Sequence, residues 1–266
     1  MSDIRSKLNA IYSMEQLAAG STGIHRLHPD SKMIVTIIYI VCVASLGRYD
    51  LARLSPFLFY PVVMVSLSEL PAGMLLRRTA AALPFCLFAG ISNLFFDRTV
   101  TGSLLGLPVT AGLLSMLMLV IRTLLCVCAV LILAGVTPFT AITDSLRRAR
   151  FPELVVTLLE MVYRFSAVLI AEAAGMLTAF RLRSGGRKWP DLREFIPFIG
   201  QLFLRSADRA ERIYHAMQCR GGGTRGTQRA RTPFRVADWL FLAAAAGSSV
   251  FFRLFDVTRW IGSLFV

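Results

Sequence analysis

Hydrophobic residues follow two different patterns along this chain, and the pattern changes near residue 137. Before that point they gather in apolar runs at about 33–46, 54–70, 79–96 and 109–136, and a last run covers about 236–255. About 20 apolar residues suffice for a helix to cross a bilayer. The pattern therefore predicts about five transmembrane helices, of which the first is short for a crossing.

Between the fourth and fifth runs, apolar positions recur at steps of three and four residues. This spacing covers about 152–183 and 191–220 and predicts two long amphipathic helices. A third, short helix is expected over about 139–150. Asp191 and Glu194 have the spacing of a capping box, and Pro197 is expected to kink the first turns of the second long helix. The predicted fold class is all-α and polytopic, with two or three long cytoplasmic amphipathic helices.

Composition and charge support a membrane protein with a basic inserted region. The chain is 55% hydrophobic with a mean hydropathy of +0.62 and a net charge of +13. Residues 137–235 hold seventeen arginines and lysines against eight acids, a balance of +9. The positive-inside tendency places this block in the cytoplasm, and four preceding crossings then put the N-terminus inside too. A nucleic-acid role is disfavoured, because a multispanning protein seldom offers such a surface.

These observations divide the chain into four predicted parts. Residues 1–31 form an amphipathic lead-in that lacks the apolar core of a cleavable signal peptide. Residues 32–136 form transmembrane helices one to four, 137–235 the cytoplasmic coupling-helix region, and 236–266 the last transmembrane helix and a tail.

The two long amphipathic stretches end alike. One closes on Phe180-Arg181-Leu182-Arg183-Ser184-Gly185-Gly186 and the other on Gln218-Cys219-Arg220-Gly221-Gly222-Gly223. Glycine supplies the left-handed residue that stops a helix, and an arginine there suits the negative end of the helix dipole. Arginine also presents a planar fork of five donors. Ordinary capping of two surface helices would explain either ending alone, but the recurrence favours docking on another protein.

The sequence offers little catalytic or metal-binding chemistry. Arg122 is the one charged residue deep within a predicted span. It acts either as a counter-ion or lateral partner contact, or it forms a polar link to a neighbouring helix terminus or snorkels from a long span. With no intramembrane Asp, Glu or His, a proton-driven carrier is disfavoured. His25 and His28 lack enough further ligands for a metal site, and no phosphate-binding loop motif occurs. We expect no catalytic residues, metal or cofactor.

Three further strings accompany the arginine endings: HRLHPDSK at 25–32, MVYRF at 161–165 and LFLRSADRAER at 202–212. Together with the endings they resemble the paired Ala-Arg-Gly signatures of the transmembrane (T) component of energy-coupling factor transporters, most closely the cobalt-transport branch called CbiQ. The resemblance covers about residues 22–256. The chain departs from the pattern in four places: Leu182 and Cys219 stand for the signature alanines, Ser184 for the first signature glycine, and His28 for an expected aspartate.

The resemblance implies a non-catalytic permease subunit of an ATP-driven importer. Such a subunit bridges two cytoplasmic ABC ATPase subunits to a membrane-embedded substrate-capture subunit, with an optional small accessory membrane subunit, in the bilayer of a prokaryotic inner (plasma) membrane. Cobalt is the expected cargo. The implied ATPase-coupling residues are Arg183, Ser184, Gly185, Arg220, Gly221 and Gly222. Further candidate partner contacts are Arg122, Arg205 and Arg209.

Other functions stay open at this point. The same coupling role could serve nickel or a vitamin, because the cargo is chosen by the capture partner. A membrane enzyme acting on lipid head groups would need an acidic or histidine cluster near the interface, which the sequence does not offer. A homo-oligomeric channel is the third alternative.

Overall fold

The computed structural model describes residues 18, 20, 22–47, 51–96, 100–104, 107–187, 189–221 and 233–255. The chain divides into two compact units. The first, called the membrane unit below, covers residues 14–142 and 232–266. The second, the inserted unit, covers residues 143–231. Almost all of the described elements are helices, which confirms the predicted all-α class.

The first helix of the membrane unit, α2, covers Pro29–Ala44 and therefore begins earlier than the predicted start at Met33. His28 acts as its N-cap, since the Asp30 N–H donates to His28 Nδ1 at 3.2 Å. Pro29 stands at the first helical position, where its missing N–H costs nothing. The earlier start places Lys32 inside the helix.

The second predicted span is a series of short elements. It consists of α3 (Leu51–Leu54), the 3-10 turn η1 (Ser55–Leu58) and α4 (Phe59–Ser68). Pro56 lies within the 3-10 turn, where it removes a backbone donor. The Tyr39 hydroxyl of α2 donates to the Phe57 carbonyl at 2.9 Å and fixes this turn against α2.

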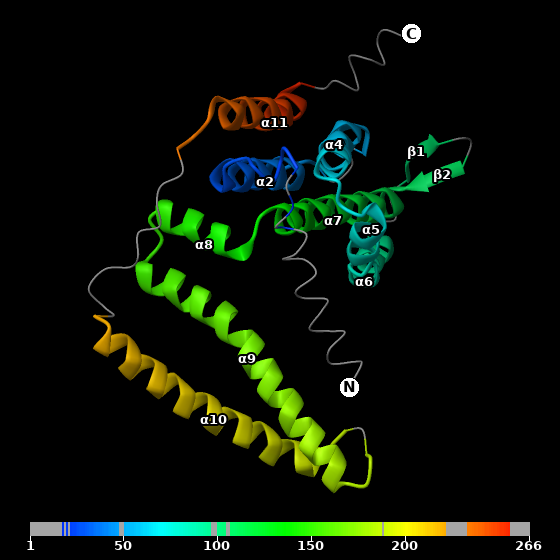
Figure 1. Cartoon of the computed structure of the whole chain (residues 1–266). Helices are drawn as coiled ribbons and strands as arrows, with labels where there is room; N and C mark the ends of the chain where they lie inside the picture. Colours follow the sequence, from blue (N-terminus) through cyan, green and yellow to red (C-terminus); the bar gives the residue numbers. More distant parts are fainter. Residues whose placement is uncertain are drawn as a thin grey trace. The chain divides into compact units, whose positions relative to one another are not determined.

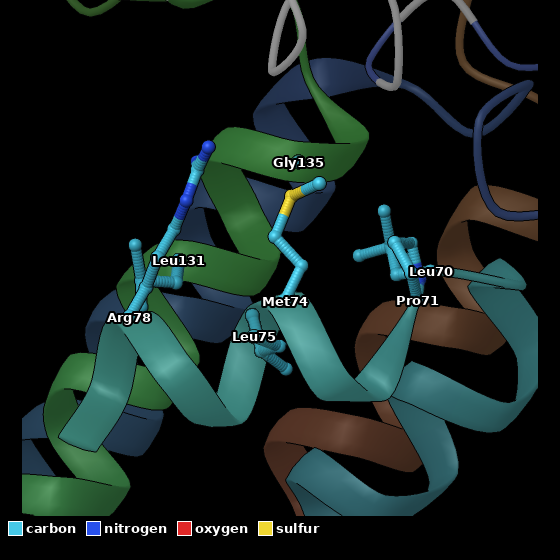
Figure 2. Close-up of a pocket in the computed structure, with 7 residues that line it drawn as sticks. All are labelled: Leu70, Pro71, Met74, Leu75, Arg78, Leu131 and Gly135. Carbon is cyan, nitrogen blue, oxygen red and sulfur yellow. The ribbon is translucent and has the colours of Figure 1, made fainter. Parts of the chain in front are cut away.

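The third predicted span and the loop before it are corrected by the structure. Helix α5 (Ala72–Ala80) occupies most of the predicted loop, and α6 (Leu83–Phe96) follows after a turn at 81–82. Helix α5 packs on α7, and Figure 2 shows Leu75 of α5 and Leu131 of α7 lining a small pocket with Gly135. A Cβ at Gly135 would stand only 3.1 Å from Leu70 Cδ1, so the close approach depends on this glycine.

A short antiparallel hairpin is the one departure from an all-helical fold among the described residues. Strands β1 (Val100–Leu104) and β2 (Leu107–Thr110) pair with Val100 opposite Thr110 and Leu104 opposite Leu107. The sequence predicted only a loop here. Valine and threonine, which occur in both strands, favour extended backbone.

Helix α7 (Ala111–Val136) packs against α2, α4, α5 and α6, and α11 (Val236–Leu254) packs on α2. The core at these contacts is fully buried at Tyr39, Val43, Phe57, Met118 and Ala129. Between α4 and α11 lies a cavity of about 320 Å³. Its lining contains no carboxylate, histidine or cysteine.

The inserted unit is dominated by two long helices. After α8 (Phe139–Arg148), which crosses the unit boundary, come α9 (Glu153–Arg183) and α10 (Leu192–Cys219). Figure 1 shows them side by side and antiparallel, joined by a loop. Their bounds match the predicted ones within two residues, and α10 continues through Pro197. The Glu194 carboxylate accepts from the Asp191 N–H at 3.0 Å, as the predicted capping box requires.

Within the described residues, four helical stretches are long and apolar enough to cross a membrane. They are Ala72–Ser92, which combines α5 with most of α6, and Gly112–Val136, Glu153–Arg183 and Val236–Leu254. A shorter apolar helix covers Ser55–Ser68. The chain is therefore a multi-pass membrane protein. Helix α9 meets this criterion although the charge pattern predicts a cytoplasmic position for it.

Candidate coupling surface

The end of α9 is a glycine cap that leaves its arginine exposed. Arg183 is the last helical residue, and Ser184 follows with its N–H donating to the Phe180 carbonyl at 2.9 Å. Gly185 adopts φ 68° and Gly186 φ 94°, and the Gly186 N–H donates to the Arg181 carbonyl at 3.0 Å. This bond, from the second residue past the cap to the third from the helix end, defines a Schellman motif. It explains why glycine, and not a side chain, follows Ser184.

At the end of α10 a left-handed glycine again follows the capping residue directly, but here the capping residue is the arginine itself. Arg220 is itself the capping residue, and Gly221 adopts φ 73° directly after it. The Arg220 N–H donates to the Met217 carbonyl at 3.1 Å and the Gly221 N–H to the Gln218 carbonyl at 3.0 Å. Gly222, the last of the predicted coupling residues, lies outside the described residues. The two arginines are thus alike in sequence but differ by one position relative to the helix cap.

Both guanidinium groups are exposed and available. No hydrogen bond or ion pair joins the side chain of Arg183 or Arg220 to another residue in the described part of the chain. Because α9 and α10 are antiparallel (Figure 1), the two arginines lie at opposite ends of the helix pair. The 28 residues of α10 extend roughly 42 Å at 1.5 Å per residue. The pair therefore presents two separate cationic tips.

The loop between the two helices is fixed by Arg187, which the sequence did not single out. Its Nη1 donates to Asp191 Oδ2 at 2.8 Å and its Nη2 to Glu194 Oε1 at 2.8 Å. The hydrogen bond to Glu194 raises the pKa of Arg187 further above its usual range, so this group stays charged. The spacing of Arg187 to the capping box, four and seven residues, was the signal that could have identified it.

A second set of charges joins the helices along their length. Glu172 of α9 accepts from Arg209 Nη2 at 3.1 Å and lies 3.6 Å from Arg205 Nη1. The Glu172 side chain is 17% exposed, whereas the two arginines are 39% and 50% exposed. The structure therefore brings two of the predicted partner contacts, Arg205 and Arg209, onto one carboxylate within the same unit. Glu172 could not be assigned from sequence, because its partners lie on another helix.

Much of the apolar surface of α9 and α10 is exposed. No residue of α10 is buried, and α9 buries only Val156 and Leu177. Leu154 and Val162 of α9 and Ile196 and Phe203 of α10 are each about two thirds exposed or more. Soluble surfaces rarely expose so many large apolar side chains on neighbouring helices. The arrangement is typical of a surface that contacts membrane or other proteins.

Arg122 has an internal partner. Its Nη2 donates to the carbonyl of Leu46 and, at 3.3 Å, to that of Gly47, just past the end of α2. Both carbonyls lie just past the negative end of the α2 dipole, where a cation is favoured. Of the alternatives for Arg122, the structure thus provides the polar link to a neighbouring helix terminus.

The sequence missed a buried polar cluster formed by His28, Lys32 and Asp238. Each side chain belongs to a residue that is 5% exposed or less. All three lie at the start of α2 or of α11, and the two spans that begin there were treated as apolar throughout. The proline after His28 and the acid two residues later, both typical of helix starts, were the available signals.

Comparison with known proteins adds a family to this geometry. The family model described as "Cobalt transport protein" (CbiQ) matches residues 20–233. The energy-coupling factor transporter transmembrane protein EcfT of Ruminiclostridium cellulolyticum is 27% identical over 219 residues, covering 77% of this chain and 81% of that protein. The cobalt transport protein CbiQ of Rhodobacter capsulatus is 37% identical over 91 residues, covering 33% of this chain and 36% of that protein.

A fused relative is matched over a smaller share of its length. The putative fused cobalt transport protein CbiMQ of Methanocorpusculum labreanum is 27% identical over 186 residues, or 69% of this chain. This chain spans only 29% of that protein.

Proposed function

The chain belongs to the cobalt transport protein family CbiQ, and we propose from this that it is the coupling subunit of an energy-coupling factor importer. In this proposal the subunit catalyses no reaction itself. It bridges two cytoplasmic ABC ATPase subunits to a membrane-embedded substrate-capture subunit, which a small accessory membrane subunit can join. Residues 137–235 form the cytoplasmic coupling region of a protein in a prokaryotic inner membrane.

The observation that carries the proposal is the pair of free arginine tips. Arg183 and Arg220 end two antiparallel helices at opposite ends, and neither guanidinium is used within the described part of the chain. A permanent planar fork with five donors suits a carboxylate-lined groove on a partner. Two separated tips suit two copies of a partner better than one. The glycines beside them, Gly185 and Gly221, lack side chains and leave room for a partner backbone to approach.

Motion at the tips would reach the whole helix pair because the pair is tied in two places. Arg187 fixes the loop to the start of α10, and Glu172 holds Arg205 and Arg209 near the middle. When ATP draws the two ATPases together, the tips would move with them. The exposed apolar faces of α9 and α10 then offer the surface through which that motion reaches the capture subunit.

Helix α9 is proposed to lie at the membrane surface and not to cross the bilayer. It carries Glu153, Glu160 and Glu172, and Arg147 contacts Glu160 at 3.3 Å. A carboxylate at the centre of a bilayer costs roughly 2.5–3.5 kcal/mol even on lenient insertion scales. A surface position lets Glu153 and Glu160, seven residues apart on one side of the helix, face water. Glu172 lies on another side, where it is paired with Arg205 and Arg209.

The cargo proposed is the cobalt ion. It rests on the family description and on the names of the relatives, not on a metal site in this chain. Nickel or a vitamin, delivered by a different capture subunit, would require the same coupling geometry. Uptake of labelled cobalt, nickel and vitamins by cells that express the whole transporter distinguishes these cargoes.

The deciding experiment removes both tips at once. The double variant Arg183→Ala/Arg220→Ala, purified with its ATPases, should lose their co-purification and abolish cobalt uptake. Removing one partner of a desolvated charged contact costs about 2–5 kcal/mol, so each single variant should already weaken the assembly. The matched control is Arg164→Ala/Arg212→Ala, which removes one exposed arginine from each of the same helices away from the ends.

The control should keep its ATPases and its uptake. Wild-type uptake in the double-tip variant, or equal losses in the control, would refute the proposed role of the tips.

A further inference from the structure

Three helix ends meet at the buried cluster of His28, Lys32 and Asp238, which is called the polar anchor below. Lys32 lies in the first turns of α2, Asp238 in the first turn of α11, and the last carbonyl of α7 is the third partner. These ends mark where the chain leaves the membrane unit after α7 and where it returns to it before α11. The anchor therefore sits on both connections to the inserted unit.

Lys32 caps the end of α7 from another helix. Lys32 is 3% exposed, and its Nζ donates to the Val136 carbonyl and to the His25 carbonyl, both at 3.2 Å. Val136 is the last residue of α7, whose final turn contains no basic residue of its own. The final carbonyls of a helix lack intrahelical donors and carry its negative dipole end, so a buried ammonium there is well placed.

Asp238 holds the starts of two helices with one carboxylate. Its Oδ2 accepts from the Arg235 N–H at 2.8 Å, which caps α11. Its Oδ1 accepts from the His28 N–H at 2.7 Å, and His28 is the N-cap of α2. A carboxylate is favoured at the positive end of a helix dipole, and here it serves two such ends. The His28 ring also stacks on Phe234 with centroids 4.2 Å apart, just before α11 begins.

Lys32 and Asp238 carry opposite charges in the same buried cluster, and each is hydrogen-bonded to backbone groups at the helix ends. Lysine and aspartate are almost never fully buried without such partners, because taking an ion out of water is costly. The apolar core at Tyr39, Val43 and Met118 already packs α2 against α7. Packing alone therefore does not require buried charges at these helix ends.

Helix ends without caps fray at low cost, and a pull on a connecting segment would first unwind the turn to which it is attached. We propose that Lys32 and Asp238 are positioning residues that lock the exit and return of the inserted unit onto α2, so that movement of the coupling helices displaces α2, α7 and α11 together and is not absorbed by fraying. This inference rests on the proposed coupling function.

The test compares uptake with ATP turnover in the whole transporter reconstituted in liposomes. Lys32→Met keeps the length of the side chain and removes its donors, and Asp238→Asn keeps the shape and removes the charge. We expect each variant to assemble with its ATPases and to hydrolyse ATP as the wild type does. Cobalt taken up per ATP should fall about tenfold, within the range typical of coupling free energies. Lys32→Arg, which keeps charge and donors, should restore much of the coupling.

The matched control is Arg253→Gln. Arg253 of α11 donates through Nη2 to the Ser45 carbonyl at 3.1 Å and so caps the C-terminal end of α2, opposite the end that contains Lys32. It should lower thermal stability without changing uptake per ATP. Amide hydrogen exchange provides a second measurement: in Lys32→Met, exchange should accelerate at 133–142 and 235–240 and stay unchanged at 112–125.

Several outcomes would contradict the proposed role of the polar anchor. These are normal uptake per ATP in both variants, an equal loss in Arg253→Gln, unchanged exchange at the helix ends, or failure of both variants to assemble, which would make the cluster a folding requirement only. If the wild-type chain itself recruits no ATPase, the proposed function fails, and that result is separate from a failure of the anchor.

Discussion

The membrane unit and the inserted unit are both helical, but they are stabilised in different ways. The membrane unit has a closed apolar core, with Tyr39, Val43 and Phe57 at most 1% exposed. In the inserted unit, α10 buries no residue at all and α9 buries two. Ion pairs at Glu172 join α9 to α10, and Arg187 pairs the loop between them with the start of α10.

This difference separates a part built for stability from a part built for contact. In the membrane unit, buried aromatic and aliphatic side chains hold the helices together by close van der Waals packing. On α9 and α10 the same residue types are exposed, so their apolar area is still available to a partner or to the membrane interface. This is also why α9 meets the composition of a membrane span while carrying three carboxylates.

The largest expected effect comes from removing one phenylalanine in each unit. Phe57→Ala should destabilise the membrane unit by about 3–5 kcal/mol, because it leaves a cavity in a packed core. Phe203→Ala, at a residue that is 68% exposed, should leave the unfolding temperature of the isolated chain unchanged and weaken only its assembly with partners. Thermal unfolding in detergent and co-purification measure the two effects. Equal unfolding temperatures for both variants would remove the contrast between the units.

One glycine-to-alanine change in each unit should alter stability by a smaller amount, lowering it in the membrane unit and raising it in the inserted unit. A Cβ at Gly90 of α6 would stand 2.7 Å from Met116 Cγ, and overpacking of this kind costs about 1–3 kcal/mol. Gly175 of α9 has no atom within 4 Å of that position, so Gly175→Ala should gain about 1 kcal/mol from helix propensity. Gly90→Ala should therefore lower the unfolding temperature and Gly175→Ala should raise it. A rise for both would show that α6 and α7 adjust freely.

The smallest expected effect tests the ion pairs of the inserted unit. Glu172→Gln removes the charge that faces Arg205 and Arg209 and should cost about 1 kcal/mol or less, because both arginines remain partly solvated. Spin labels on α9 and α10 should report a broader distribution of distances in this variant than in the wild type. Raising the salt concentration should broaden the wild-type distribution toward that of the variant. Glu153→Gln, at the far end of α9, is the control and should leave the distribution narrow.

The local features of this protein were readable from its residues. The three- and four-residue spacing predicted α9 and α10 within two residues, and Asp191 with Glu194 predicted the capping box. The glycines after Arg183 and Arg220 predicted the helix ends, and the quoted strings predicted the family that the comparison then matched. The predicted start of α2 and the loop predicted in place of α5 were wrong. The capping by His28 and the packing of α5 on α7 were not recognised from the sequence.

By itself, the sequence determined where α9 and α10 form and stop, which of their positions are apolar, and which family the chain belongs to. These properties depend on residues within about one helical turn of one another, which is the reach of periodicity and capping. Only the tertiary structure decided which charges meet: Glu172 with Arg205 and Arg209, Arg122 with the end of α2, and Lys32 and Asp238 across three helix ends. Such pairings depend on the register and rotation of helices that are far apart in the chain, and no spacing within one helix contains that information.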